Sequence, residues 1–151
     1  MEIGHVHLSV ADLDRSTDFY RDGLGLEVTA DARPVGIPVV FLAHGDYHHH
    51  IGLNAFESAG AEPAPEGHPG LYHVAFVLPD RDALVAAVGR LEAHGYEVDR
   101  GRDHGATVSV YLYDPDRNGV ELYYDRPREF WYDDAGNPVL RNDPVDPHDL
   151  P

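Results

Sequence analysis

The chain has 151 residues, 42% of them apolar, and a formal net charge of −16. This length suffices for one compact domain or for two small units that share a core. The sequence contains no cysteine, which excludes disulfides, thiolate zinc sites and cysteine nucleophiles. A metal site would therefore use histidine and carboxylate ligands, and the eleven histidines make one possible.

The charge and hydropathy of the chain restrict its partners. A strongly acidic chain is repelled by a phosphate backbone, which argues against nucleic acid. No stretch approaches the roughly 20 apolar residues of a membrane span, and the N-terminus shows no apolar run of signal-peptide length. We therefore expect a cytoplasmic protein whose partners are small molecules.

The first elements in chain order read as a strand, a helix and further strands. HVHLSV, starting at His5, alternates between faces and predicts a strand. Asp12 is a candidate helix cap, apolar residues then recur at roughly helical spacing, and Gly23 and Gly25 end the segment. Short return strands are expected in PVVFLAHG and YHHHIGLNAF.

The same order recurs from residue 71. LYHVAFVLPDRDALVAAVGRLEAHGYEV again predicts a strand, an acid-capped helix and a glycine stop, and TVSVYLYDPD and GVELYYDR predict the return strands. His5 and His73 begin equivalent strands, and Gly52 and Glu121 fall on equivalent late positions. We therefore predict an internal duplication: module one at 1–58, a linker at 59–70 and module two at 71–125.

Residues 126–151 follow the second module as a tail. Phe130, Trp131 and Tyr132 are expected to dock the tail onto the body of the protein. The final prolines and aspartates predict no regular element.

The duplication singles out three polar residues as metal ligands. His5 and His73 occupy equivalent positions, and Glu121 stands in an apolar strand where an unpaired carboxylate would be unfavourable. The fourth equivalent position is Gly52, which has no side chain. Two histidines, one carboxylate and open coordination positions favour non-haem Fe(II), with Mn(II) or another divalent ion as the alternative.

HVHLSVADLDRSTDFYRDGLGLEV, LYHVAF and DPDRNGVELYY resemble the vicinal oxygen chelate superfamily of glyoxalases, bleomycin-resistance proteins and extradiol dioxygenases. The resemblance covers about residues 1–125. It implies an α+β fold of two tandem βαβββ modules, whose cupped, mostly antiparallel sheet surrounds a metal site. The ligand positions of the superfamily fall on His5, His73 and Glu121.

The resemblance is greatest to small two-module extradiol catechol dioxygenases. Glyoxalase I carries a fourth ligand where this chain has Gly52. The dioxygenase branch implies three further roles: His50 as acid and base, Tyr111 as the group that binds the substrate oxygen, and His104 as a second histidine that orients substrate. By strand alternation His48 would share the face of His50 and line the substrate pocket. His49 would point to the opposite face.

The implied reaction inserts both atoms of dioxygen into a catechol beside its vicinal hydroxyls. The partners would be a small aromatic diol and dioxygen, and small members of this fold commonly form dimers or higher homo-oligomers. Two alternatives stay open: a metal-dependent small-molecule binding or resistance protein, and a glyoxalase-like lyase of the same fold. Joint presence of His50 and Tyr111 with the three ligands favours the dioxygenase.

Overall fold

The computed structural model describes residues 1–65 and 67–151. Glu66, which falls in the expected linker 59–70, lies outside the described residues. The chain divides into two compact units. Unit 1 comprises Met1–Gly70 and Asp114–Arg117, and unit 2 comprises Leu71–Tyr113 and Asn118–Pro151.

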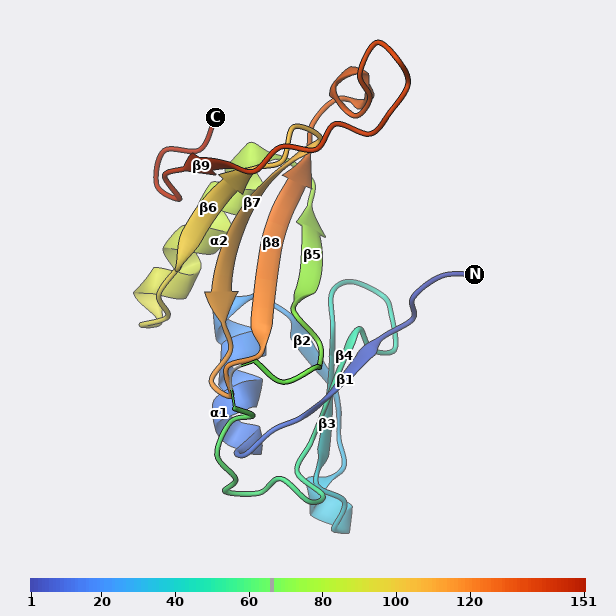
Figure 1. The fold of residues 1–151 in the computed structure, drawn as a ribbon. Coiled ribbons are helices and arrows are strands. Elements are labelled where there is room, and N and C mark those ends of the chain that lie inside the picture. The colour runs from blue at the N-terminus through green and yellow to red at the C-terminus, as the bar shows by residue number, and fades with distance from the viewer. Residues whose placement is uncertain (66) are drawn as a thin grey trace. The chain divides into compact units, whose positions relative to one another are not determined.

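Unit 1 contains one four-stranded sheet with the strand order β1-β4-β3-β2 (Figure 1). β1 runs parallel to β4, whereas β3 pairs antiparallel with both β4 and β2. The elements are β1 (Val6–Ser9), α1 (Leu13–Asp18), the π-helical turn η1 (Phe19–Gly23), β2 (Glu27–Asp31), the 3-10 turn η2 (Arg33–Val35), β3 (Val39–Ala43) and β4 (Ile51–Asn54).

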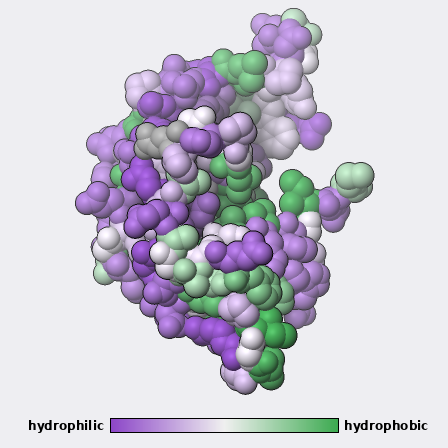
Figure 2. Space-filling model, turned by 60° about the horizontal axis from the view of Figure 1, so that its bottom comes forward, coloured by the Kyte–Doolittle hydropathy of each residue, from purple (hydrophilic) through white to green (hydrophobic). Residues whose placement is uncertain are grey.

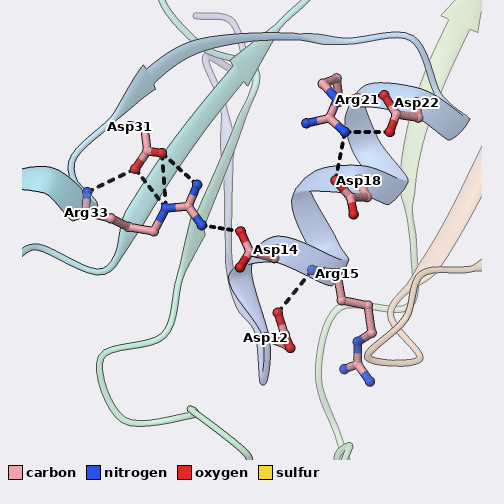
Figure 3. Close-up of polar contacts among 8 residues, drawn as sticks. All are labelled: Asp12, Asp14, Arg15, Asp18, Arg21, Asp22, Asp31 and Arg33. Carbon is pink, nitrogen blue, oxygen red and sulfur yellow. Dashed lines mark hydrogen bonds and ion pairs between the residues drawn. The ribbon is translucent and has the colours of Figure 1, made fainter.

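α1 begins where the sequence places its cap. The Asp12 carboxylate accepts a hydrogen bond from the Arg15 amide at 3.0 Å (Figure 3), which satisfies one of the free N–H groups at the helix start. Phe19 and Tyr20 are fully buried. The Tyr20 hydroxyl donates to Asp114 Oδ2 at 3.0 Å, and burial together with this carboxylate raises the pKa of Tyr20 well above its usual value.

Unit 2 contains a five-stranded sheet with the strand order β5-β8-β7-β6-β9. β5 and β8 are parallel, and the remaining pairs are antiparallel. The elements are β5 (Val74–Leu78), α2 (Arg81–Ala93), β6 (Arg100–Asp103), β7 (Thr107–Tyr113), β8 (Gly119–Asp125), the 3-10 turn η3 (Arg128–Phe130) and β9 (Asp143–Val145).

α2 has the same type of cap as α1. Asp80 Oδ1 accepts from the Ala83 amide at 2.8 Å. One face of the helix is buried, and its side chains Leu84, Ala87, Val88 and Leu91 recur at helical spacing. This apolar face forms the core of unit 2 together with buried strand residues.

The strand register confirms the two-module α+β fold. In unit 1, β1 aligns His7, two positions after His5, with Gly52 of β4. In unit 2, β5 aligns Ala75, two positions after His73, with Glu121 of β8. The two modules therefore use the same register at the positions that the sequence treats as equivalent.

The tail departs from its prediction. Residues 143–145 form β9, which pairs antiparallel with β6, although the prolines and aspartates of this segment predicted no regular element. β9 forms because β6 would otherwise be a sheet edge with unpaired backbone groups. Trp131 Nε1 donates to the carbonyl of Arg126 at 2.7 Å, which is a contact within the tail, and Phe130 and Tyr132 are exposed. These contacts therefore do not show the expected docking of the three aromatic residues onto the body of the protein.

The surface is predominantly polar. Figure 2 shows charged and polar residues, in purple, over most of the face that it presents, with smaller apolar areas in green. Several arginines are paired locally with the surplus carboxylates, for example Arg21 with Asp18 and Asp22, and Arg33 with Asp31 (Figure 3). Among the described residues, none of the helices combines the length and apolarity needed to cross a membrane.

Candidate functional site

Unit 2 brings four of the predicted site residues together on one face of its sheet. Tyr111 on β7 lies directly opposite Glu121 on β8. His73 precedes β5 and shares the side-chain parity of Ala75, the β5 partner of Glu121. His104 follows β6 at the turn into β7. The backbone register alone therefore places these residues close together.

These four side chains form a continuous polar chain. His73 Nε2 lies 2.9 Å from Glu121 Oε2, and the Tyr111 hydroxyl lies 2.8 Å from Glu121 Oε1. His104 Nε2 lies 2.7 Å from the same hydroxyl. The other nitrogen of His104, Nδ1, lies 3.0 Å from the backbone carbonyl of Arg141 in the tail.

Hydrogen-bond chemistry restricts the protons in this chain. A carbonyl oxygen only accepts, so His104 Nδ1 must carry the proton that it donates to Arg141. The Tyr111 hydroxyl has one proton and can donate either to Glu121 or to His104. When it donates to Glu121, Nε2 must also be protonated, and His104 is then an imidazolium. His104 Nε2 is thus the nitrogen that can exchange a proton with Tyr111.

Tyr111 is held in its neutral form. Burial, followed by the hydrogen bond and charge of Glu121, raises the pKa of Tyr111 to about 12. The Arg100 guanidinium lies 4.9 Å from the centre of the Tyr111 ring, a cation–π distance. At neutral pH the hydroxyl is therefore a hydrogen-bond donor in a fixed position.

Unit 1 gathers a second group of aromatic and histidine rings. The His49 ring lies 4.4 Å from that of His5 and 4.3 Å from that of Phe41. The prediction that His49 points away from this face is wrong, because residues 47–50 precede β4 and strand alternation does not apply to them. Burial and the neighbouring histidines lower the pKa of His49, so its ring is neutral around pH 7.

His50 and His48 lie in the same loop. His50 Nδ1 accepts a hydrogen bond from the His44 amide at 3.2 Å. A neutral His50 therefore carries its proton on Nε2. His48 is exposed, its ring stacks on Tyr47 at 4.2 Å, and its Nδ1 lies 2.7 Å from Nδ1 of His49.

Gly52 is buried, because the ring of its strand partner His7 lies against it. A Cβ at this position would lie 3.0 Å from the imidazole of His7, so the ring of His7 occupies the space beside the glycine. His7 itself is exposed. The position equivalent to Glu121 thus offers no ligand in this unit.

Comparison with known proteins now places the chain in a family. Residues 2–122 match the model of the Glyoxalase/Bleomycin resistance protein/Dioxygenase superfamily. The chain belongs to this superfamily. The resemblance of the sequence to vicinal oxygen chelate proteins is thereby confirmed.

Individual members of the superfamily show similarity over most of the chain. Catechol-2,3-dioxygenase of Bacillus subtilis is 38% identical over 146 residues, which cover 95% of this chain and 49% of that protein. Biphenyl-2,3-diol 1,2-dioxygenase 3 of Rhodococcus globerulus is 32% identical over 82% of this chain and 63% of its own length. The chain therefore spans about half to two thirds of these curated relatives.

A solved structure gives a further comparison. Lactoylglutathione lyase from Agrobacterium tumefaciens has a TM-score of 0.62 and 27% identity, with 82% of this chain and 92% of that chain covered. The superfamily fold thus accommodates a protein named as a lyase as well as proteins named as dioxygenases.

The residues of unit 2 fit part of a superfamily metal site. Two ligands at about 2.1 Å from a metal and at right angles are about 3 Å apart, close to the 2.9 Å between His73 Nε2 and Glu121 Oε2. His73 Nδ1 is buried and has no partner among the described residues, whereas a ligating histidine usually donates from its second nitrogen. His5, the third predicted ligand, belongs to unit 1. Within residues 1–65 and 67–151, no three histidine or carboxylate side chains are close enough together to hold a metal ion.

Two residues that contact the candidate site, Arg141 and Arg100, were not predicted from the sequence. The backbone of Arg141 enters through a carbonyl group, which leaves no side-chain signal. Arg100 contacts Tyr111 through its guanidinium, and its strand position opposite Tyr111 could be found only from the register. The only sequence signal for the first was Gly105 beside His104.

Proposed function

We propose that this protein is an extradiol dioxygenase that cleaves a catechol-type ring beside its two hydroxyl groups. The observation that carries the proposal is the chain of contacts from His104 through Tyr111 to Glu121 and His73. The relatives named as catechol and biphenyl-diol dioxygenases support it. The donor set of two histidines and one carboxylate suits a divalent metal with open positions.

His5, His73 and Glu121 would hold the metal, with Fe(II) as the expected ion and Mn(II) as the alternative. When bound, the metal would bring the diol and dioxygen together and allow electron transfer between them. The ligand residues would fix its position and leave coordination sites for both substrates.

The remaining residues would manage hydrogen bonds and protons. Tyr111 would donate from its hydroxyl to a substrate oxygen, and His104 would exchange a proton with Tyr111 through Nε2. His50, with its Nδ1 occupied by the His44 amide, would act through Nε2. In its neutral form Nε2 carries a proton, so His50 first serves as a donor, and it can act as a base only after that proton leaves. His48 would line the substrate pocket.

The experiment is to load the protein with Fe(II) without oxygen and to supply a panel of catechols of different sizes with dissolved dioxygen. We expect dioxygen uptake equal to catechol consumed, because both oxygen atoms enter the product, together with a yellow ring-opened product. A panel with neither uptake nor product would contradict the proposal. Catechol binding without uptake would support a binding or resistance protein.

Substitutions distinguish the metal ligands from the residue proposed to act as acid and base. His73→Ala and Glu121→Ala should lose bound iron, whereas His50→Gln should keep iron and lose turnover by about 100-fold or more. His94→Gln, on an exposed histidine at the end of α2, is the matched control and should change neither property. Loss of iron in His50→Gln would show that its role is misassigned.

The similarity to lactoylglutathione lyase favours one second candidate, a glyoxalase-like lyase. The buried Gly52 beside the His7 ring argues against it, since the position equivalent to Glu121 offers no ligand. Turnover of a hemithioacetal by metal-loaded protein, without dioxygen uptake on catechols, would favour the lyase over the dioxygenase.

A further inference from the structure

The C-terminal tail reaches the candidate site through a short segment. We name residues 138–145 the C-terminal strap. Its last three residues form β9, whose register aligns Gly101 with Val145 and Asp103 with Asp143. His104 is the next residue after β6. The strap therefore runs along the strand that leads directly into His104.

The strap contacts His104 from two directions. Its Arg141 carbonyl lies 3.0 Å from His104 Nδ1, and the Arg141 amide donates to the His104 carbonyl at 3.4 Å. The ring of His104 is thus held between Arg141 on one side and Tyr111 on the other. A ring with both nitrogens occupied has a fixed orientation and a fixed assignment of nitrogens.

Two glycines allow the strap to lie this close. A Cβ on Gly101 would be 2.7 Å from the carbonyl oxygen of Val145, and a Cβ on Gly105 would be 2.4 Å from Val139 Cγ1. Gly105 also has a φ of 85°, a conformation that favours glycine. The sequence around His104 is therefore adapted to contact with the strap.

The tail is anchored beyond the strap. Leu150 is buried, with 2% of its surface exposed, and its carbonyl accepts from Arg81 Nε at 2.8 Å. The Tyr124 hydroxyl donates to the Pro151 carbonyl. On the other side of the strap, the Val139 amide donates to the Trp131 carbonyl at 2.9 Å. Contacts on both sides of the strap hold it in place.

We infer that the C-terminal strap is a positioning element of the site: the Arg141 carbonyl fixes the proton of His104 on Nδ1 and aims Nε2 at the Tyr111 hydroxyl. Its catalytic consequence rests on the proposed function, in which Tyr111 binds a substrate oxygen. Arg141 acts through His104 and Tyr111 and does not itself touch the substrate. A strap displaced from β6 would leave His104 free to rotate or to carry its proton on Nε2, the nitrogen that faces Tyr111.

The first test does not depend on turnover. Long-range ¹⁵N–¹H NMR of the full chain, labelled at histidine and measured without metal at pH 8.5, reports which imidazole nitrogen carries a proton. His104 should show a protonated Nδ1 in the wild-type chain. An unprotonated Nδ1 there would overturn the inference without any variant being needed.

The variants displace the strap in two ways. Gly101→Ala pushes β9 from β6, and Gly105→Ala pushes Val139; both should shift His104 Nδ1 toward an unprotonated signal. Gly136→Ala is the matched control, because Gly136 has a φ of 80° but nothing within 4 Å of an added Cβ. Arg141→Ala, which retains the carbonyl, should also leave the signal unchanged. An unchanged signal in both strap variants, once each is shown to be folded, would contradict the inference.

Activity provides the second readout. In iron-loaded protein the strap variants should lose about 10- to 100-fold in kcat, with KM and bound iron little changed, whereas Gly136→Ala should match the wild type. If no catechol is turned over by the wild type, the proposed function fails while the NMR result still decides the position of the proton. If the NMR signals behave as expected but kcat in the strap variants is unchanged, the catalytic role of the strap is excluded.

Discussion

In unit 2 the Tyr111 hydroxyl links His104 to the pair formed by Glu121 and His73. It lies 2.7 Å from His104 Nε2 and 2.8 Å from Glu121 Oε1. Its single proton cannot satisfy both neighbours, so its hydrogen bonding depends on the protonation of His104. A single oxygen atom thus couples a predicted metal ligand to the histidine that the tail holds.

Removal of this oxygen should slow turnover. Tyr111→Phe keeps the ring beside Arg100 but breaks both contacts. We expect a loss of about 10- to 100-fold in kcat, because outer partners of metal ligands typically have effects of this size. Iron content and dioxygen uptake should be measured together. Tyr132→Phe, at an exposed tail position, should match the wild type; an equal loss there would point to a nonspecific effect.

Individual residues also show where sequence reasoning succeeded and failed. The resemblance to dioxygenases implied a role for Tyr111, and the register of β7 and β8 places it directly opposite Glu121. The orientation of His49 does not follow from strand alternation, because His49 lies in the loop before β4. The proton position in His50 depends on the amide of His44, a contact that only the fold creates.

The buried face of α2 forms part of the core of unit 2. Leu84→Ala should lower the free energy of unfolding by about 2–5 kcal/mol, because Leu84 is fully buried and its truncation leaves a cavity. Val85→Ala, on the neighbouring position with 40% of its surface exposed, should lower it by about 0.5 kcal/mol or less. Urea unfolding measures both. Similar losses for the two variants would show that this face of α2 is not the packed one.

The end of the tail has a pH-dependent contact with α2. His148 Nε2 lies 2.6 Å from Glu92 Oε1, and this hydrogen bond, followed by that to Asp146, raises the pKa of His148. The contribution of a group with a raised folded-state pKa is fully present below its unfolded pKa of about 6.5 and is lost as the pH rises through the folded value.

The resulting prediction compares His148→Ala with the wild type. The mutation should lower Tm more at pH 5.5 than at pH 9, because only the protonated imidazole forms an ion pair with Glu92. Glu92→Gln should remove most of this pH dependence. A Tm difference that grows with rising pH would contradict the assignment.

Elements with strong periodicity or caps could be predicted from the sequence, and the tail could not. Asp12 and Asp80 mark the starts of α1 and α2 as expected. β9 consists of Asp143, Pro144 and Val145, residues that do not favour strands by themselves. It exists because β6 offers an edge, which is a property of the folded sheet and not of the segment.

The whole molecule carries a large excess of negative charge. With 27 acidic residues against 11 arginines, like-charge repulsion opposes the compact state, and salt screens this repulsion. We expect Tm to rise between 10 mM and 300 mM NaCl. An equal osmolality of sucrose is the control for effects other than screening. A falling Tm would mean that the surface ion pairs contribute more than the repulsion.

The segment Asp114–Arg117 has a consequence for the order of folding. It joins two strands of unit 2 yet belongs to unit 1, where Asp114 accepts from the buried hydroxyl of Tyr20, 94 positions earlier in the chain. Without that carboxylate the hydroxyl is buried unpaired, which is unfavourable. During synthesis, unit 1 is therefore incomplete until most of unit 2 has left the ribosome. Despite the duplicated pattern, unit 1 gains this contact only after β7 has been synthesised.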